Sequence, residues 1–259
     1  MPVDWDELRK EMIPLKDFED MRRRWREAFA FPFVQTAYNF RMPQIAAHTR
    51  RLLEEDTRGR YADYAQSLTA TFDRLRQAGV RDVMDIVGRV DGRGQFEQFI
   101  GQAGLEASGL IAALKFLVYW FIPSNKYLSG LVGADSPLQP AIRVLRGQNI
   151  RTSLDILQQG LTRADRKALA EKCDLPEAEI NELLNRADLS RMPWASKATI
   201  SNIIGAGYGS LAQLAAADYE QVYRDFFRYG ASIEKNLKLG NEIDNSHRIA
   251  RLMPVVLEG

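Results

Sequence analysis

The chain has 259 residues, and 46% of them are hydrophobic, which excludes a chain that is disordered throughout. Lys and Arg number 35 against 34 Asp and Glu, so the net charge of +1 lacks the basic excess of a dedicated nucleic-acid binder, whose affinity comes from neutralising phosphates. The single cysteine, Cys173, excludes an intramolecular disulfide and disfavours a cysteine-based metal site, and we expect it to be buried.

At the N-terminal end, residues 1–73 predict a helical domain. Apolar side chains here recur at steps of three and four, which places them on one face of a helix: Phe18, Met21, Trp25 and Phe29. Residues 43–55 and a stripe from Tyr61 to Leu75 predict two further helices, with a loop at 56–59. The arginines at 22–24 and 26 lie among acidic residues, so we expect ion pairs on an exposed helix face rather than a phosphate-binding patch.

From residue 74 onward, the sequence repeats itself with a shift of 70 positions. Residues 79–123 align with 149–193 without a gap, so that turn residues, apolar positions and a proline coincide. A third start lies at Gly207. In each copy a turn residue precedes an apolar residue, and a helix N-cap follows at Asp82, Thr152 or Ser210. The repeat predicts units at 74–143 and 144–206, and a partial unit with C-terminal helices at 207–259.

Runs of alternating β-branched residues, which are typical of strands, do not occur in the sequence. We therefore predict an all-α fold, in which an N-terminal helical domain is followed by tandem repeats.

The second copy contains the residues that indicate a family. Residues 187–193 read Ala-Asp-Leu-Ser-Arg-Met-Pro, an amphipathic helix runs through Ile203 and Ile204, and the segments 205–208 and 210–215 follow. This pattern resembles the domain-of-unknown-function family 4332, over residues 74–240, whose members are similar to tandem helix-hairpin-helix modules. The resemblance implies a helix-hairpin-helix-like fold, and such modules commonly grip the DNA backbone without reading its sequence.

The hairpin positions depart from the pattern of DNA-binding helix-hairpin-helix modules. Those modules use two glycines that let backbone N–H groups approach a phosphate. Here the hairpins fall at 122–126 and 192–197, which lack the two glycines, and Trp194 obstructs a close approach. Lys126 and Lys197 remain as candidate phosphate contacts. Nucleic-acid binding through these lysines is therefore the alternative function and not the preferred one.

Residues 110–122 form the longest apolar stretch of the chain. The aligned stretch 180–192 is amphipathic, so the first copy needs a surface that covers it on all sides. The candidates for that covering surface are the N-terminal helices, a protein partner and a second copy of the chain. A lipid surface is a weaker option, because no basic face accompanies the stretch. We expect burial within the chain for most of this helix, and a partner-binding surface that includes Phe116, Tyr119, Trp120, Phe121 and Trp194.

No residue pattern points to catalysis. Gly205, Gly207 and Gly209 lack the preceding strand of a dinucleotide-binding loop, and His48 and His247 have no Cys or His at ligand spacing. We predict no catalytic residue, no metal site and no cofactor. A helical enzyme with dispersed catalytic residues is the third-ranked interpretation.

The apolar stretch 110–122 is shorter than the roughly 20 residues of a membrane span, and the acidic N-terminus lacks a signal-peptide pattern. We therefore expect a cytoplasmic protein without a membrane span. The predicted function is that of a non-catalytic adaptor or scaffold, which binds other proteins or a second copy of itself through helical surfaces. The alternative is a nucleic-acid-binding protein without sequence specificity.

Overall fold

The computed structural model describes residues 3–54, 62–193, 195–235, 237 and 239–258. These residues form helices α1 to α16 and one short 3₁₀ helix, and they contain no β-strand, so the predicted all-α class is confirmed. The predicted loop at 56–59 and Trp194 lie outside the described residues. The chain divides into two compact units, Met1–Pro123 and Ser124–Gly259, which we call unit 1 and unit 2. The finer division at residues 73, 143 and 206 stays a prediction.

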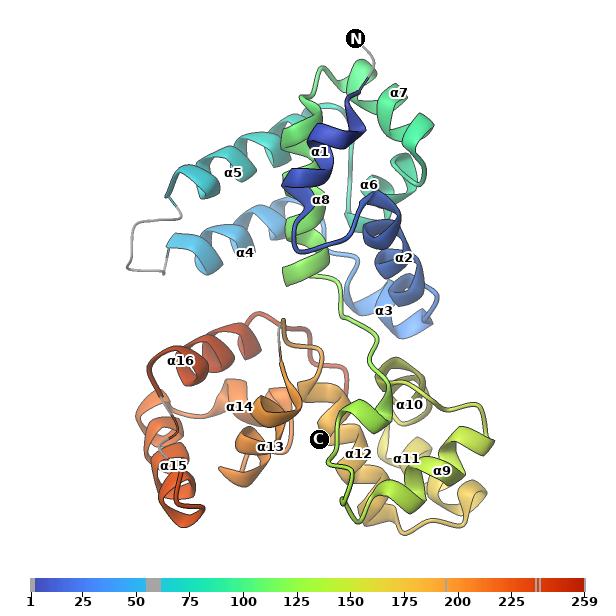
Figure 1. Ribbon diagram of the computed structural model, residues 1–259, viewed down its shortest axis with the longest axis vertical. Coiled ribbons are helices and arrows are strands. Elements are labelled where there is room, and N and C mark those ends of the chain that lie inside the picture. The colour runs from blue at the N-terminus through green and yellow to red at the C-terminus, as the bar shows by residue number, and fades with distance from the viewer. Residues whose placement is uncertain (1–2, 55–61, 194, 236, 238, 259) are drawn as a thin grey trace. The chain divides into compact units, whose positions relative to one another are not determined.

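Unit 1 contains the first eight helices (Figure 1): α1 (Trp5–Met12), α2 (Phe18–Phe29), α3 (Pro32–Ala37), α4 (Met42–Glu54), α5 (Ala62–Gln77), α6 (Val83–Arg89), α7 (Arg93–Ala103) and α8 (Ala107–Trp120). The predicted apolar face of α2 is buried at Phe18, Met21 and Trp25. Helices α4 and α5 pack against each other, and α5 also packs on α8.

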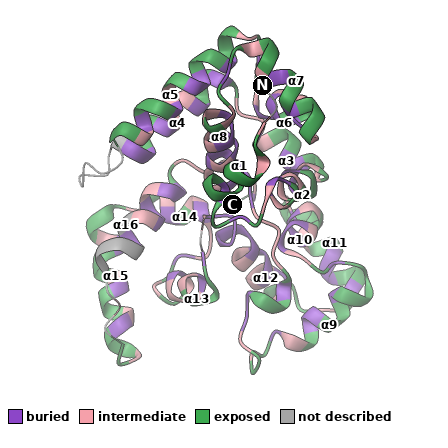
Figure 2. Cartoon of the chain, turned by 45° about the horizontal axis from the view of Figure 1, so that its top comes forward, coloured by how far each residue is buried: buried purple, intermediate pink, exposed green. Residues whose placement is uncertain are grey.

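Helix α8 lies at the centre of unit 1. Helices α1, α2, α5 and α7 all pack on it, which explains why this stretch is apolar around its whole circumference. Seven of its side chains, from Leu110 to Val118, are buried (Figure 2). Its one charged side chain, Lys115, donates through Nζ to the backbone oxygen of Glu11 at 2.8 Å, where the last turn of α1 presents unpaired carbonyls.

Unit 2 contains the 3₁₀ helix η1 (Leu128–Gly130) and eight further helices: α9 (Gln139–Gly147), α10 (Ser153–Gln159), α11 (Arg163–Cys173), α12 (Glu177–Leu189), α13 (Lys197–Gly205), α14 (Leu211–Ala216), α15 (Tyr219–Ser232) and α16 (Leu239–Ala250). Helix α12 is central here, since α10, α11 and α13 pack on it. Helices α14 and α15 both pack on α16. Cys173 is buried at the end of α11, as predicted, and burial raises the pKa of its thiol.

The end of α12 carries a buried ion pair. Asp188 and Arg191 are 3% and 1% exposed, and the carboxylate oxygen Oδ1 accepts from Arg191 Nε at 3.0 Å and also from Nη2. The second oxygen of Asp188 accepts from the backbone N–H of Leu211, the first residue of α14, at 2.8 Å. Arg191 also donates to the backbone oxygen of Pro254 at 3.0 Å. These bonds join α12, α14 and the segment after α16.

One kind of turn occurs before α6, α10 and α14. Each turn has a residue with positive φ, namely Gly79 (79°), Asn149 (62°) and Gly207 (102°). The next residue donates its N–H back to the end of the preceding helix, in the bonds Val80 to Leu75, Ile150 to Leu145 and Tyr208 to Ile203. The predicted N-caps then follow, and each side-chain oxygen accepts the backbone N–H of the third helical residue: Asp82, Thr152 and Ser210.

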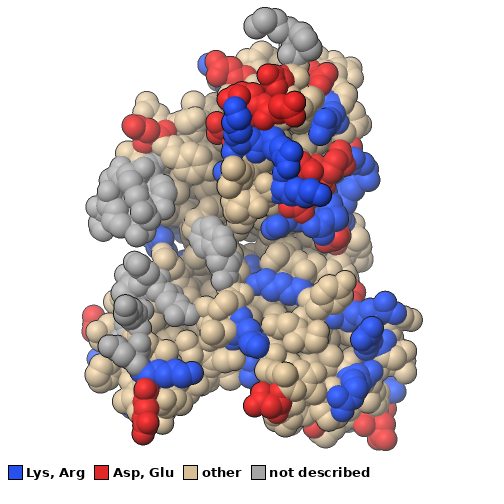
Figure 3. All heavy atoms as spheres, viewed as in Figure 1, with Lys and Arg blue, Asp and Glu red and all other residues tan. Residues whose placement is uncertain are grey.

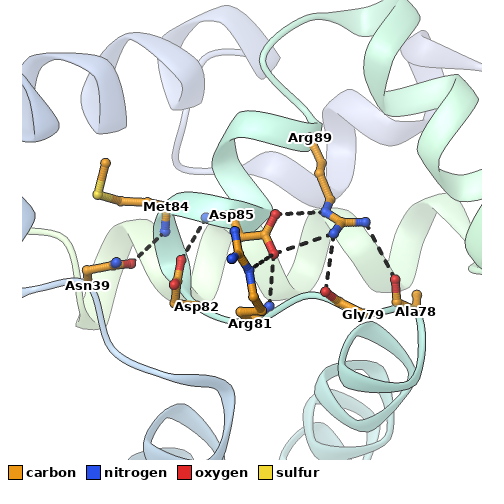
Figure 4. A network of polar contacts seen from close by, with 8 residues as sticks. All are labelled: Asn39, Ala78, Gly79, Arg81, Asp82, Met84, Asp85 and Arg89. Carbon is orange, nitrogen blue, oxygen red and sulfur yellow. Dashed lines mark hydrogen bonds and ion pairs between the residues drawn. The ribbon is translucent and has the colours of Figure 1, made fainter.

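Figure 4 shows the first of these turns. Asp85, the third residue of α6, accepts the backbone N–H of Arg81 at 3.0 Å and the side chain of Arg89 at 2.9 Å. Arg89 also donates to the backbone oxygen of Gly79 at 3.2 Å. Burial alone would raise the pKa of Asp85, but the hydrogen bonds from Arg89 and Arg81 hold it below its usual range. The carboxylate therefore clamps the turn and α6 together.

Candidate partner-binding surface

Two of the five aromatic residues predicted to bind a partner lie in the core of unit 1. Phe116 and Phe121 are buried, and their ring centroids are 5.6 Å apart. The ring of Phe121 also stacks on His48 at 5.7 Å, and burial followed by the charge of Arg51 lowers the pKa of that imidazole. Tyr119 and Trp120 at the end of α8 are half-buried. The role of these four residues in partner binding stays a prediction, and Trp194 is outside the described residues.

The two lysines of the nucleic-acid alternative have different surroundings. The Lys126 ammonium donates to the backbone oxygens of Ser190 at 3.0 Å and Ala195 at 2.7 Å. Burial lowers the pKa of Lys126 to about 8. This side chain therefore holds the end of α12 to the chain before η1. Lys197 is exposed and is the first residue of α13, directly after the N-cap Ser196.

The arginines of α2 form ion pairs on the helix surface, as predicted. Arg22 lies 2.5 Å from Glu19, Arg23 lies 2.9 Å from Glu27, and Arg26 pairs with Asp91. Basic and acidic side chains lie side by side over the part of unit 1 that contains α1 and α2 (Figure 3). Because these charges compensate one another locally, the arginine run does not create a basic patch.

Helix α15 presents an aromatic surface that the sequence reasoning missed. Tyr219, Tyr223 and Phe227 follow one another at intervals of four residues and are 36%, 43% and 64% exposed. The adjacent face of the same helix is buried through Val222, Phe226 and Gly230. We call the exposed side, formed by Tyr219, Tyr223, Phe227 and the adjacent Glu220, Arg224 and Arg228, the α15 surface.

Close packing on its buried side holds α15 in place. The ring of Tyr229 lies so near the backbone of Gly205 in α13 that a Cβ there would be 2.1 Å from a ring carbon, so only glycine allows this approach. The ring of Tyr208 stacks on Phe226 with centroids 6.4 Å apart. Asp225 fixes the same region by accepting from the Tyr208 hydroxyl at 2.9 Å. Burial and this bond raise the pKa of Tyr208 to about 12.

The charges on the α15 surface change from acidic to basic along the helix. Its first turn has the exposed acid Glu220, its middle has the exposed base Arg224, and its C-terminal half has the exposed base Arg228. Arg224 donates to the side-chain oxygen of Gln221 at 2.9 Å, and Arg228 lies 3.5 Å from Asp225. Both guanidinium groups thus interact with polar side chains of α15 itself.

The sequence contained a signal for this surface, but the signal was ambiguous. In residues 219–230 two apolar rows with the same spacing lie side by side, and helical periodicity alone does not say which row faces the core. Tyrosine at two of the three positions favours the row 219, 223 and 227 as the exposed one, because its hydroxyl remains hydrated at a surface.

The described residues contain no group of three or more His, Cys, Asp or Glu side chains that could hold a metal ion. His247 is buried, and its Nε2 lies 2.9 Å from the backbone oxygen of Ala217, so the imidazole joins α16 to the end of α14. No single helix in the described ranges has the length and hydropathy of a membrane span. Helices α7 and α8 reach that threshold only as a pair, which is bent by 117°.

Comparison with known proteins identifies one family. Residues 140–242 match the model of the family described as Domain of unknown function (DUF4332). The predicted similarity to this family is therefore confirmed over residues 140–242, and the matched segment begins in α9 rather than at residue 74. It includes the Asp188–Arg191 pair and the α15 surface. No curated protein and no solved structure matches the chain.

Proposed function

We propose that this protein is a non-catalytic adaptor or scaffold, which binds another protein through the α15 surface. The observation that supports the proposal is the row of three exposed aromatic side chains on one helix. Aromatic residues and arginine are enriched at the centres of protein interfaces, where aromatic rings bury large areas. The α15 surface contains both residue types.

The rigidity of α15 also favours a binding role. The Gly205–Tyr229 contact and the Tyr208–Asp225 bond fix the helix from its inner side, so the exposed rings are held in place before a partner arrives. Preorganisation of this kind lowers the entropy that is lost on association. An exposed apolar row on a firmly packed helix is more typical of an interface than of a partly folded segment.

For the architecture, we propose that the three similar turns begin copies of one duplicated, helix-hairpin-helix-like module, placed after an N-terminal helical domain. The supporting observations are the matching φ values and the matching capping bonds at residues 79–85, 149–155 and 207–213. A second match supports the first two copies. Asn39 and Asn125 each accept, through the side-chain oxygen, the backbone N–H of the second helical residue, from Met84 at 2.9 Å and Leu154 at 3.2 Å.

Nucleic-acid binding is the second candidate function, because Arg224 and Arg228 lie beside exposed rings on which bases could stack. Two observations favour a protein partner instead. The Lys126 ammonium already donates to two backbone carbonyls, and the α15 surface has the acidic Glu220 at one end. High affinity for nucleic acid needs a continuous basic surface that neutralises several phosphates, which this helix does not provide.

The test is affinity purification of tagged full-length protein from native lysate, with and without nuclease. The wild type is compared with Phe227→Asp and with the matched control Tyr127→Asp, which changes an aromatic residue that is 70% exposed outside α15. We expect nuclease-resistant partners that Phe227→Asp loses and Tyr127→Asp retains. Partners that disappear after nuclease treatment would favour nucleic acid, and equal retention by both variants would overturn the proposal.

A further inference from the structure

We infer that the α15 surface binds the same surface of a second copy of this chain, with the two α15 helices antiparallel. This inference rests on the proposed function and specifies the partner. It depends on two properties of α15 that a self-complementary interface requires. The apolar row is symmetric about its middle residue, and the charges reverse sign from one end of the helix to the other.

The apolar row matches itself when two copies face each other in opposite directions. With Tyr223 beside the two-fold axis, Tyr219 of one copy faces Phe227 of the other, and the reverse contact forms at the opposite end. Residues four apart form one ridge of a helix surface, and two such ridges interdigitate when the helices cross at about −50°. The rings of Tyr223 and Phe227, which are the two most exposed of the row, then fill gaps in the facing row.

The charges support the antiparallel direction. In this orientation Glu220, in the first turn of one α15, lies opposite position 226 of the other, between Arg224 and Arg228. A parallel arrangement would place Glu220 against Glu220 and Arg228 against Arg228, and like charges across an interface are unfavourable. Antiparallel α15 helices also bring opposite ends of their dipoles together.

The interface is small, because one helix row from each copy forms it. Interfaces below about 1,200 Å² are typical of weak, reversible complexes. We therefore expect a monomer–dimer equilibrium that depends on protein concentration. The relevant measurement is sedimentation velocity and equilibrium of the purified full-length chain between roughly 1 and 200 µM, a range that covers micromolar dissociation constants.

Two charge variants test the contact directly. Glu220→Arg makes the α15 surface basic at 220, 224 and 228, and the double variant Arg224→Glu with Arg228→Glu makes it acidic at the same positions. Each variant alone repels its own copy, so we expect the dimer dissociation constant to rise roughly ten-fold or more. An equimolar mixture of the two should form a heterodimer at least as stable as the wild-type dimer. Phe227→Asp should abolish association of every form, and Tyr127→Asp should leave it unchanged.

The outcomes separate this inference from the proposed function. Dimerisation of the wild type, its loss in the charge variants and its recovery in the mixture would support the antiparallel contact. A wild-type chain that stays monomeric at every concentration overturns the inference, as does a dimer that both charge variants retain. If the chain is monomeric but Phe227→Asp still loses a nuclease-resistant partner from lysate, the adaptor function survives with a different partner. If Phe227→Asp changes neither measurement, both proposals are wrong.

Discussion

Replacement of Asp188 by asparagine tests how strongly the buried ion pair holds unit 2 together. Asp188 is 3% exposed, and its carboxylate accepts from Arg191 and from the backbone N–H of Leu211. The substituted amide would keep the size of the side chain, but it would leave the Arg191 guanidinium without a counter-ion in a buried site. The amide would have only one oxygen to accept hydrogen bonds from both Arg191 and the backbone N–H of Leu211.

The expected loss in the free energy of unfolding is about 3–5 kcal/mol, the range for removing one partner of a buried ion pair. Most of this loss comes from the uncompensated charge of Arg191 and not from the absent attraction. Asp188→Leu combined with Arg191→Met removes both charges, so this double variant should lose less than the single variant. The matched surface control is Glu171→Gln, whose partner Lys167 lies 4.0 Å away on the exposed side of α11, and it should change stability by less than about 0.5 kcal/mol.

The assay is urea unfolding followed by circular dichroism, combined with hydrogen exchange to assign each transition to unit 1 or unit 2. The assignment is needed because a chain of two units need not unfold in one step. We expect the loss to appear in α12 and α14, with α8 unchanged. A loss below about 1 kcal/mol for Asp188→Asn, or a larger loss for the double variant than for the single one, would show that the pair does not have this role.

Three further predictions follow from single contacts. The folded-state pKa of Lys126 is about 8, and its ordinary value is 10.5. Between these pH values the unfolded state binds more protons than the folded state, so the free energy of unfolding of unit 2 should rise with pH. Chemical denaturation at several pH values measures this rise, and the variant Lys126→Met should lack it. Gly205→Ala should destabilise unit 2 by about 1–3 kcal/mol, because the new methyl group meets the ring of Tyr229. Gly101→Ala, in the last turn of α7 where a methyl group meets nothing, should stabilise unit 1 by about 0.5–1 kcal/mol in thermal unfolding. Trp5→Ala should lower the free energy of unfolding of unit 1 by about 2 kcal/mol. This loss is smaller than for a fully buried tryptophan, because the indole of Trp5 is half-buried. An unchanged melting curve would refute this prediction.

The helix boundaries that follow turns were predictable because their chemistry is local. A residue that tolerates positive φ, an apolar residue and an N-cap occupy four consecutive positions, and the bonds they form reach only a few residues. Asp82, Thr152 and Ser210 therefore cap helices where the sequence placed them. The buried face of α2 was predictable for a similar reason, since its periodicity within one helix identifies the side chains that face inward.

The candidate surface was not predictable from periodicity, because its identity depends on which neighbours a helix finds. Lys126 looked like a phosphate ligand in the sequence, yet its partners are carbonyls 64 and 69 residues later in the chain. Phe116 looked like a partner contact, yet the rings of Tyr64 and Phe72 lie 6.3 Å from it within unit 1. Such long-range pairings leave no mark in the local pattern.

The packing of α1 on α8 has a consequence for the order of events during synthesis. Helix α1 ends at Met12, and the helix that receives it begins at Ala107. At roughly 5–20 residues per second, the first helix leaves the ribosome roughly 5–20 s before its partner. An eight-residue helix has little stability alone in water. Unit 1 therefore completes its core only after residue 120 is made.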